Sequence, residues 1–255
     1  MKFGRTEPYT REEKPRLVLE HHLDTSVLPA PPAVVDRATK VASWPMYGND
    51  TIGDCTIATT GHEIQSWTAY SGSEATIPED AVIKAYSAVS GYDPATGEND
   101  NGANIQDVLN YWRKTGIGGH KIAGFAELAS LDNLTLAKQC LDLFGTVYLG
   151  INVPQSAMDQ TNAGEIWDDV GDDNIIGGHA IPVQLWSTDV PGEITVITWG
   201  QTQKMTRKFW VKYVEEAWVV FSDDELNAQG LTVDGLNVES LRADFKELTG
   251  QAASF

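Results

Sequence analysis

The chain has 255 residues, of which 42% are hydrophobic and 21% charged. This is enough apolar material for one large domain or two small ones, and the composition excludes a disordered or collagen-like chain. No stretch approaches the roughly 18 consecutive apolar residues of a membrane-spanning helix. Eighteen basic residues against 36 acidic ones give a net charge of −18. That charge repels phosphate backbones and anionic lipid, so neither nucleic acid nor a membrane surface is an expected partner.

The first 28 residues mix charged residues with proline and show no sustained period, which predicts an extended N-terminal arm. Its charges alternate where a secretory signal has a continuous apolar stretch, so we expect no export. We expect the arm to lie over its own surface or over a neighbouring subunit, held by the apolar triplet Leu17–Leu19 and by backbone pairing to a sheet edge. The arm is thus the candidate contact for a homo-oligomer or an assembly partner, and a frayed terminus is the alternative. On this interpretation, removing residues 1–25 leaves the thermal midpoint nearly unchanged and abolishes assembly or partner binding.

Four helices are predicted in the first half, because apolar residues repeat there on one helical face. Suitable ends support them: Pro78 suits a first helical position, Asn104 suits a cap, and Gly116 suits the residue after a helix end. The predicted ranges are about 55–70, 78–89, 105–115 and 134–144.

After Gly145 the pattern changes from helical to extended, in segments rich in valine, isoleucine, threonine and tryptophan. One amphipathic segment at 206–213 interrupts the strands, and a last helix is predicted at 238–248. A helical half followed by a β half predicts an α+β fold. The expected organisation is a domain at 29–255, with a helical lobe at about 47–145, a β lobe at about 146–222 and a C-terminal helical segment at 223–255.

Two cysteines are too few for a disulfide framework, and both thiols are expected to be free. Cys55 stands where a loop rich in glycine, asparagine and aspartate gives way to helical periodicity, so its sulfur is expected at a helix N-terminus. Unpaired backbone N–H groups and the helix dipole favour a thiolate there and lower the thiol pKa from about 8.5. A small buried residue on a helix face is the alternative for any free cysteine. That alternative fits Cys140, which lies inside a leucine-rich helix.

His179 opens an apolar strand directly after two glycines, which permit close approach of the backbone. A histidine there can be a hydrogen-bonded core residue or can point into a cleft. Because Cys55 opens a helix in one half and His179 opens a strand in the other, the pair fits a nucleophile and a base that meet between two lobes.

The order of these motifs resembles the papain-like cysteine peptidases over roughly residues 29–222. In that family a glutamine stands six residues before the cysteine and a glycine two residues before it. Here Asn49 and Gly53 stand at those positions relative to Cys55. The whole chain also resembles papain-like proteins of bacteria and their phages.

The second half carries the rest of the resemblance. The family histidine is followed by a small residue, as His179 is here, and a later strand ends in Trp-Gly, as at residues 199–200. The family asparagine that holds the histidine is replaced by Ile197, which accepts no hydrogen bond. Thr198 or Gln201 is the candidate to replace it.

The resemblance implies a two-lobed α+β fold with a site between the lobes. It implies Cys55 as nucleophile, His179 as general base and then acid, and the Asn49 amide with the Cys55 backbone N–H as an oxyanion hole. The implied activity is cleavage of peptide or isopeptide amide bonds in a peptide or protein substrate. The rival class is a catalytically silent, virion-associated or structural protein that docks through its arm. A cytoplasmic or virion location fits these classes.

No cofactor or metal is expected. The five histidines show no metal-ligand spacing. The loop at 93–104 is rich in oxygen ligands and glycine, which raises calcium as an alternative, although its spacing is not that of a helix–loop–helix site. Asx-rich turns have the same composition.

Overall fold

The computed structural model describes residues 1–24, 28–188, 193–222 and 246. The predicted helix at 238–248 and the predicted C-terminal segment lie outside the described residues, apart from residue 246. A 3₁₀ turn, η1, comprises Leu19–His21. The described helices are α1 (Cys55–Tyr70), α2 (Glu79–Ser90), α3 (Ile105–Lys114), α4 (Leu134–Phe144), α5 (Gln155–Ala163) and α6 (Arg207–Tyr213). The described strands are β1 (Val34–Asp36), β2 (Gly124–Glu127), β3 (Val147–Pro154), β4 (Ile175–Ser187), β5 (Ile194–Thr198), β6 (Gln201–Met205) and β7 (Val214–Phe221).

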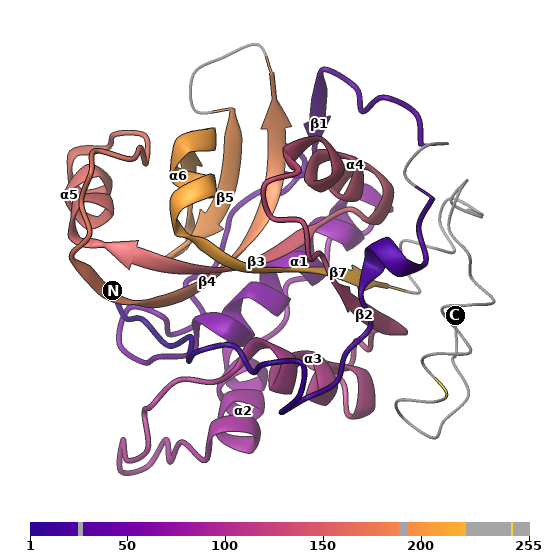
Figure 1. Cartoon of the computed structure of the whole chain (residues 1–255). Helices are drawn as coiled ribbons and strands as arrows, with labels where there is room; N and C mark the ends of the chain where they lie inside the picture. Colours follow the sequence, from indigo (N-terminus) through magenta and orange to yellow (C-terminus); the bar gives the residue numbers. More distant parts are fainter. Residues whose placement is uncertain (25–27, 189–192, 223–245, 247–255) are drawn as a thin grey trace.

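The strands form one antiparallel sheet in the order β2-β7-β3-β4-β5-β6, with β1 paired to β4 (Figure 1). The predicted α+β fold is confirmed. The four predicted helices agree with α1 to α4 within one residue at each end. The sequence did not predict β1, β2, β6 or α5. The strands β1 and β2 are short and gain their hydrogen bonds from distant strands, and β6 is a mostly polar segment. Ala157 is the sole buried residue of α5, so α5 has little apolar periodicity.

The two faces of the sheet bury two separate cores. Along β3, Val147 and Leu149 face one core together with α4 and α6, whereas Tyr148 faces the other together with α1, α2 and α3. Figure 1 shows α2 and α3 on one side of the sheet and α4 and α6 on the other. Because strand side chains alternate between faces, one strand serves both cores. α4 therefore packs in the core of the sheet half, although it lies within the predicted helical lobe.

The helix α1 lies between the other elements and is almost entirely buried. Two of its polar side chains donate to backbone inside the protein: Gln65 to the Ser43 carbonyl and Ser66 to the Arg37 carbonyl. A Cβ on Gly61 would come within 2.6 Å of the Tyr47 ring, so this glycine lets the loop before α1 pack against the helix. These contacts hold α1 against the segment of chain that precedes it.

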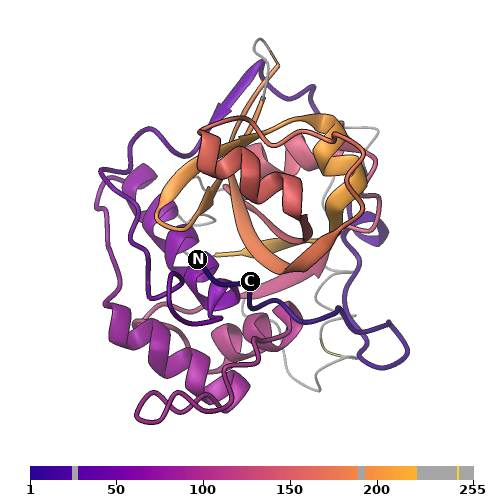
Figure 2. The same cartoon turned by 90° about the vertical axis from the view of Figure 1, so that its left-hand side faces the viewer.

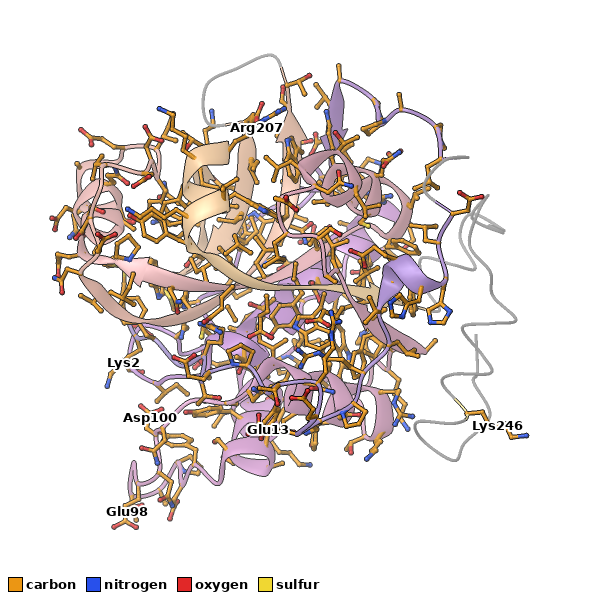
Figure 3. The ribbon with its side chains drawn as sticks, viewed as in Figure 1. Lys2, Glu13, Glu98, Asp100, Arg207 and Lys246 are labelled. Atoms are coloured by element: carbon orange, nitrogen blue, oxygen red, sulfur yellow. The ribbon has the colours of Figure 1, made fainter. Side chains whose placement is uncertain are left out.

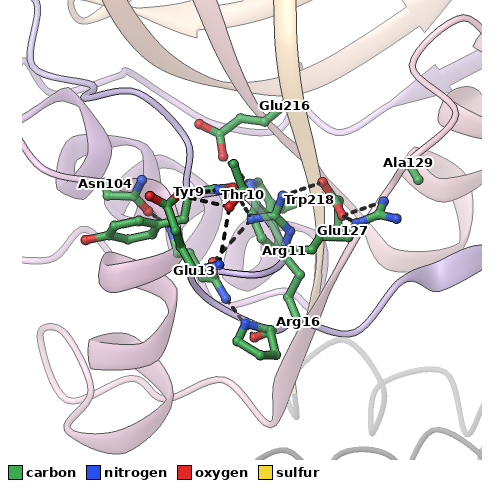
Figure 4. Close-up of polar contacts among 12 residues, drawn as sticks. Tyr9, Thr10, Arg11, Glu13, Arg16, Asn104, Glu127, Ala129, Glu216 and Trp218 are labelled. Atoms are coloured by element: carbon green, nitrogen blue, oxygen red, sulfur yellow. Dashed lines mark hydrogen bonds and ion pairs between the residues drawn. The ribbon is translucent and has the colours of Figure 1, made fainter.

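The N-terminal arm lies along its own chain. Leu17 and Leu19 are buried in the core that contains α4 and α6, and the Leu17 carbonyl accepts a hydrogen bond from the Glu127 backbone N–H in β2 at 2.9 Å. Figure 4 shows Arg11 and Arg16 meeting the Glu127 carboxylate. Removing residues 1–25 would open this core, so from the structure we expect the thermal midpoint to fall, contrary to the expectation from the sequence. None of the described helices is long and apolar enough to cross a membrane.

Candidate active site

Cys55 is the first residue of α1, as the sequence predicts. The loop before it passes through left-handed backbone at Tyr47 (φ 57°) and Gly48 (φ 89°). The backbone N–H groups of Thr51 and Ile52 donate to the Gly48 carbonyl and close the turn. This loop presents the thiol at the end of the helix where backbone N–H groups are unpaired.

Cys55 and His179 line one small cavity between α1 and the strands β4 and β5. Its volume is about 10 Å³, which is room for about one water molecule. Asn49 and Thr198 are also part of the wall. The three site residues predicted from the sequence are therefore brought together. The remaining lining residues are Met46, Ala58, Thr59, His62, Ala180, Ile197 and Trp199.

The imidazole of His179 is held on two sides. Its Nε2 and the Thr198 hydroxyl form a hydrogen bond of 2.7 Å, and the Trp199 ring stacks on it at 4.5 Å between ring centroids. Of the two candidates to replace the family asparagine, Thr198 makes this contact, whereas Gln201 is exposed on β6. Nδ1 of His179 is buried without a hydrogen-bond partner. Nδ1 is thus the ring nitrogen that has no hydrogen-bond partner and can accept a proton.

Both members of the pair are neutral in this state. Each is 1% exposed. Burial, helped by the positive charges of Arg5 and His62, lowers the pKa of His179 to about 3. Burial also raises the pKa of the Cys55 thiol to about 12, against backbone hydrogen bonds from Ala180 and Gly4. The predicted lowering of the Cys55 pKa is wrong for this state, because the loss of hydration outweighs the helix N-terminus.

Asp54, directly before the cysteine, is a buried acid that the sequence analysis did not single out. Neither of its carboxyl oxygens makes a hydrogen bond of good geometry, although the Asn49 side chain lies near enough to favour the charged form. Burial raises the pKa of Asp54 to about 8, so the group is mostly protonated at neutral pH. Because Asp54 is mostly protonated, it places little negative charge beside the Cys55 thiol.

Asn49 is placed on the cavity wall but its amide is already engaged. Its Nδ2 donates to the Ile52 carbonyl at 3.2 Å, and its own backbone carbonyl accepts from the Lys2 N–H at 3.0 Å. Because the amide nitrogen carries two hydrogens, this bond leaves one N–H of Nδ2 that can donate to an oxyanion.

The first residues of the arm cross over the cavity. The Phe3 ring lies edge-on to the His179 ring, with centroids 6.0 Å apart. A Cβ on Gly4 would come within 1.7 Å of the Gly53 carbonyl oxygen, so the two backbones are in direct contact. Figure 2 shows the N-terminus at the junction of the helices and the sheet. The Gly4 backbone also hydrogen-bonds the Cys55 thiol, so the arm contributes to the burial of that thiol.

Backbone hydrogen bonds hold this segment to both sides of the junction. The Arg5 N–H donates to the Gly178 carbonyl in β4 at 3.0 Å, and the Gly4 carbonyl accepts from the Ala103 N–H before α3 at 2.7 Å. At the outer end, Lys2 and Asp100 lie close together, 3.9 Å apart at their charged atoms (Figure 3). No local sequence signal marks these contacts, because they join residues about a hundred or more positions apart.

The described residues contain no group of three or more histidine, cysteine, aspartate or glutamate side chains placed to hold a metal ion. His62 instead hydrogen-bonds the Pro45 carbonyl at 2.8 Å. In the loop considered for calcium, the Asp100 carboxylate accepts hydrogen bonds of 2.8 Å from the Gly53 N–H and the Tyr86 hydroxyl. That carboxylate ties the loop to the active-site turn.

No protein-family model matches the sequence, and no curated protein matches it either. Solved structures do match. Xylellain, a cysteine protease from Xylella fastidiosa, is 15% identical, with a TM-score of 0.64 over 86% of this chain and 96% of its own. Procathepsin B S9 from Trypanosoma congolense is 11% identical, with a TM-score of 0.58 over 86% of this chain and 87% of its own.

Procathepsin L 3 from the Tenebrio molitor larval midgut is 14% identical, with a TM-score of 0.56 over 87% of this chain and 83% of its own. The chain therefore has the papain-like cysteine protease fold, in agreement with the motifs around Cys55 and His179.

Proposed function

We propose that this protein is a thiol hydrolase that cleaves peptide or isopeptide amide bonds, with Cys55 as the nucleophile and His179 as the general base and acid. The observation that carries the proposal is the single cavity that Cys55, His179 and Thr198 share, in a fold whose solved neighbours are cysteine proteases. Thr198 is proposed to replace the missing asparagine and to hold the imidazole by its hydroxyl.

The proposed reaction uses the two ring nitrogens of His179 differently. With Nε2–H donating to Thr198, Nδ1 accepts the thiol proton, and the thiolate adds to the amide carbonyl carbon. The imidazolium then returns the proton to the leaving amine as the C–N bond breaks, which leaves a thioester on Cys55. A water molecule, deprotonated by the same imidazole, adds to the thioester and releases the acid and the free thiol.

The tetrahedral intermediates carry a negative oxygen that needs donors. The backbone N–H of Cys55 at the helix start is one proposed donor. The other is the second N–H of the Asn49 amide, since the bond to the Ile52 carbonyl uses only one of its two hydrogens. Each such donor contributes about 3 to 4 kcal/mol to transition-state stabilisation in a comparable hydrolase. Gly4 lies against this region, so the arm has to be displaced before a substrate carbonyl can enter.

The experiment uses the full chain with Gly4→Ala, which displaces the arm, and a panel of fluorogenic peptide and isopeptide substrates. We expect cleavage that is lost in the added variants Cys55→Ala and His179→Ala and retained in Cys140→Ala, which removes the thiol that lies inside α4. Mass spectrometry of the products with and without an added amine separates hydrolysis from acyl transfer.

The competing proposal is the silent structural protein that docks through its arm. The comparisons give it no support. Absence of turnover across the panel, together with absence of any acyl adduct on Cys55 after incubation with an activated peptide ester, would favour that protein class over the hydrolase.

A further inference from the structure

Arg5 has the most buried charged group of the arm. Its side chain is 1% exposed. Nη1 donates to the Glu216 carboxylate at 3.1 Å, and Nη2 donates to the Asn152 side-chain oxygen at 2.8 Å and to the Glu215 carboxylate. Its Nε is buried without a hydrogen-bond partner. A guanidinium removed from water needs such partners, and the bonds at Nη1 and Nη2 make this a built site and not a surface ion pair.

The site is formed by three adjacent strands. Gly150 in β3 pairs with Glu216 in β7, and Asn152 in β3 pairs with Gly178 in β4. A Cβ on Gly150 would lie 2.7 Å from Cδ of Arg5. A Cβ on Gly178 would likewise lie 3.2 Å from its Nε. The two glycines therefore leave the volume that the arginine side chain fills, and Gly178 directly precedes His179.

Neighbouring residues of the fold position the carboxylates around Arg5. Trp218 donates its indole N–H to the second oxygen of Glu216 at 2.7 Å. Glu215 is 30% exposed and closes the outer side. Two carboxylates and one amide oxygen around a planar group suit arginine better than lysine, because the guanidinium presents several donors in one plane.

The backbone of the arm is bound in a way that does not depend on its sequence. Gly4 and Arg5 pair with Ala103 on the helical side and with Gly178 on the sheet side through main-chain groups. An extended peptide held by backbone hydrogen bonds and recognised by one side chain is a general mode of peptide binding. The arm is thus held here in the same way as an extended bound peptide, with Arg5 as its buried charged side chain.

We propose that the pocket formed by Gly150, Asn152, Gly178, Glu215 and Glu216 is an arginine subsite. The substrates of the proposed hydrolase are then peptides with an arginine beside the residue held over Cys55. Arg5 fills the subsite as an internal ligand until the arm is displaced. This inference rests on the proposed function, and the net charge of −18 also attracts cationic peptides to the molecule.

The test measures binding separately from cleavage. The full chain carries Gly4→Ala and Arg5→Ala, which lift the arm and empty the pocket, together with Cys55→Ala to prevent turnover. Fluorescently labelled hexapeptides that differ only at one position, with arginine, citrulline, lysine or leucine, are titrated and followed by anisotropy. We expect the arginine peptide to bind at least about 10-fold more tightly than the citrulline peptide, which has the same shape without the charge.

Variants of the pocket supply the second comparison. Glu216→Gln and Glu215→Gln in the same background should reduce the arginine preference to about twofold or less. Glu98→Gln makes the same charge change in an exposed loop and should leave the arginine preference unchanged. If Glu216→Gln does not fold, the peptide titrations are made with Glu215→Gln alone, since Glu215 is partly exposed. If the chain with several substitutions is unstable, Arg5→Ala alone takes its place.

The outcomes separate the two proposals. Equal binding of the arginine and citrulline peptides, or a preference that survives both glutamine variants, overturns the subsite. Arginine-selective binding without cleavage by the chain that retains Cys55 supports the subsite and overturns the hydrolase. Cleavage without any arginine preference supports the hydrolase and overturns the subsite.

Discussion

Displacing the arm should restore the reactivity of Cys55. Gly4→Ala is the smallest change that does this, because the added Cβ would lie 1.7 Å from the Gly53 carbonyl oxygen. The atoms that clash belong to the backbone of Gly53, so no side-chain rotation can relieve the contact. The arm stays attached through Leu17 and Leu19, which pack in the core far along the chain. The substitution therefore uncovers the thiol without opening the core.

The size of the effect follows from the thiol pKa. At the buried pKa of about 12, the thiolate fraction at pH 7 is about 10⁻⁵. At the ordinary pKa of about 8.5 the fraction is about 3%, which is roughly 3000-fold higher. Exposure also removes the steric barrier, and His179 and the helix N-terminus then favour the thiolate further. We expect alkylation of Cys55 to be at least about 100-fold faster in Gly4→Ala than in the parent chain.

The assay is limiting iodoacetamide at pH 7, with the extent of labelling at Cys55 and Cys140 read by mass spectrometry. Glu12→Ala, an exposed substitution in the same arm, is the matched control and should label at the parent rate. Cys140 should stay unreactive throughout, because burial raises its pKa as well. Parent-like labelling of Cys55 in Gly4→Ala, or equal labelling of both cysteines, would refute the reasoning.

Three further predictions follow from single contacts. Thr198→Val in the arm-displaced chain should lower kcat about 10-fold or more with little change in KM, whereas Gln201→Ala should not; equal kcat values would contradict the role of the Thr198 hydroxyl. Leu19→Ala should lower the free energy of unfolding by about 2–5 kcal/mol in urea titrations, since Leu19 is fully buried. A change below about 0.5 kcal/mol would mean that the arm is not part of the core. Burial raises the pKa of Glu63 to about 8, so the folded chain keeps a proton that the unfolded chain loses near pH 4. The contribution of Glu63 to stability is therefore complete below about pH 4 and falls as the pH rises toward 8, by up to about 1.4 kcal/mol per pH unit. Glu63→Gln should flatten this part of the curve of thermal midpoint against pH, and parallel curves for the two proteins would contradict the assignment.

The sequence by itself determined the elements whose residues repeat with a clear period. The helices α1, α3 and α4 were predicted with their ends, because their apolar faces and their caps are local features; Asn104 accepts from the Gln106 N–H as a cap, and Gly145 ends α4 in left-handed backbone. The candidate residues Cys55 and His179 were also identified from sequence, since each stands where one period changes to another. The order of these two motifs along the chain then indicated the papain-like fold.

Only the tertiary structure decided how these residues behave. Whether Thr198 or Gln201 meets the imidazole depends on how β5 ends, with Trp199 in left-handed backbone at φ 46°. The pKa of a thiol at a helix start depends on everything that covers it, and here the cover comes from residues far from Cys55 in the sequence. The pairing of Arg5 with Glu216 joins positions 211 residues apart. Such contacts leave no periodic trace in the chain, because the free energy that favours them arises from burial and charge brought together by the fold.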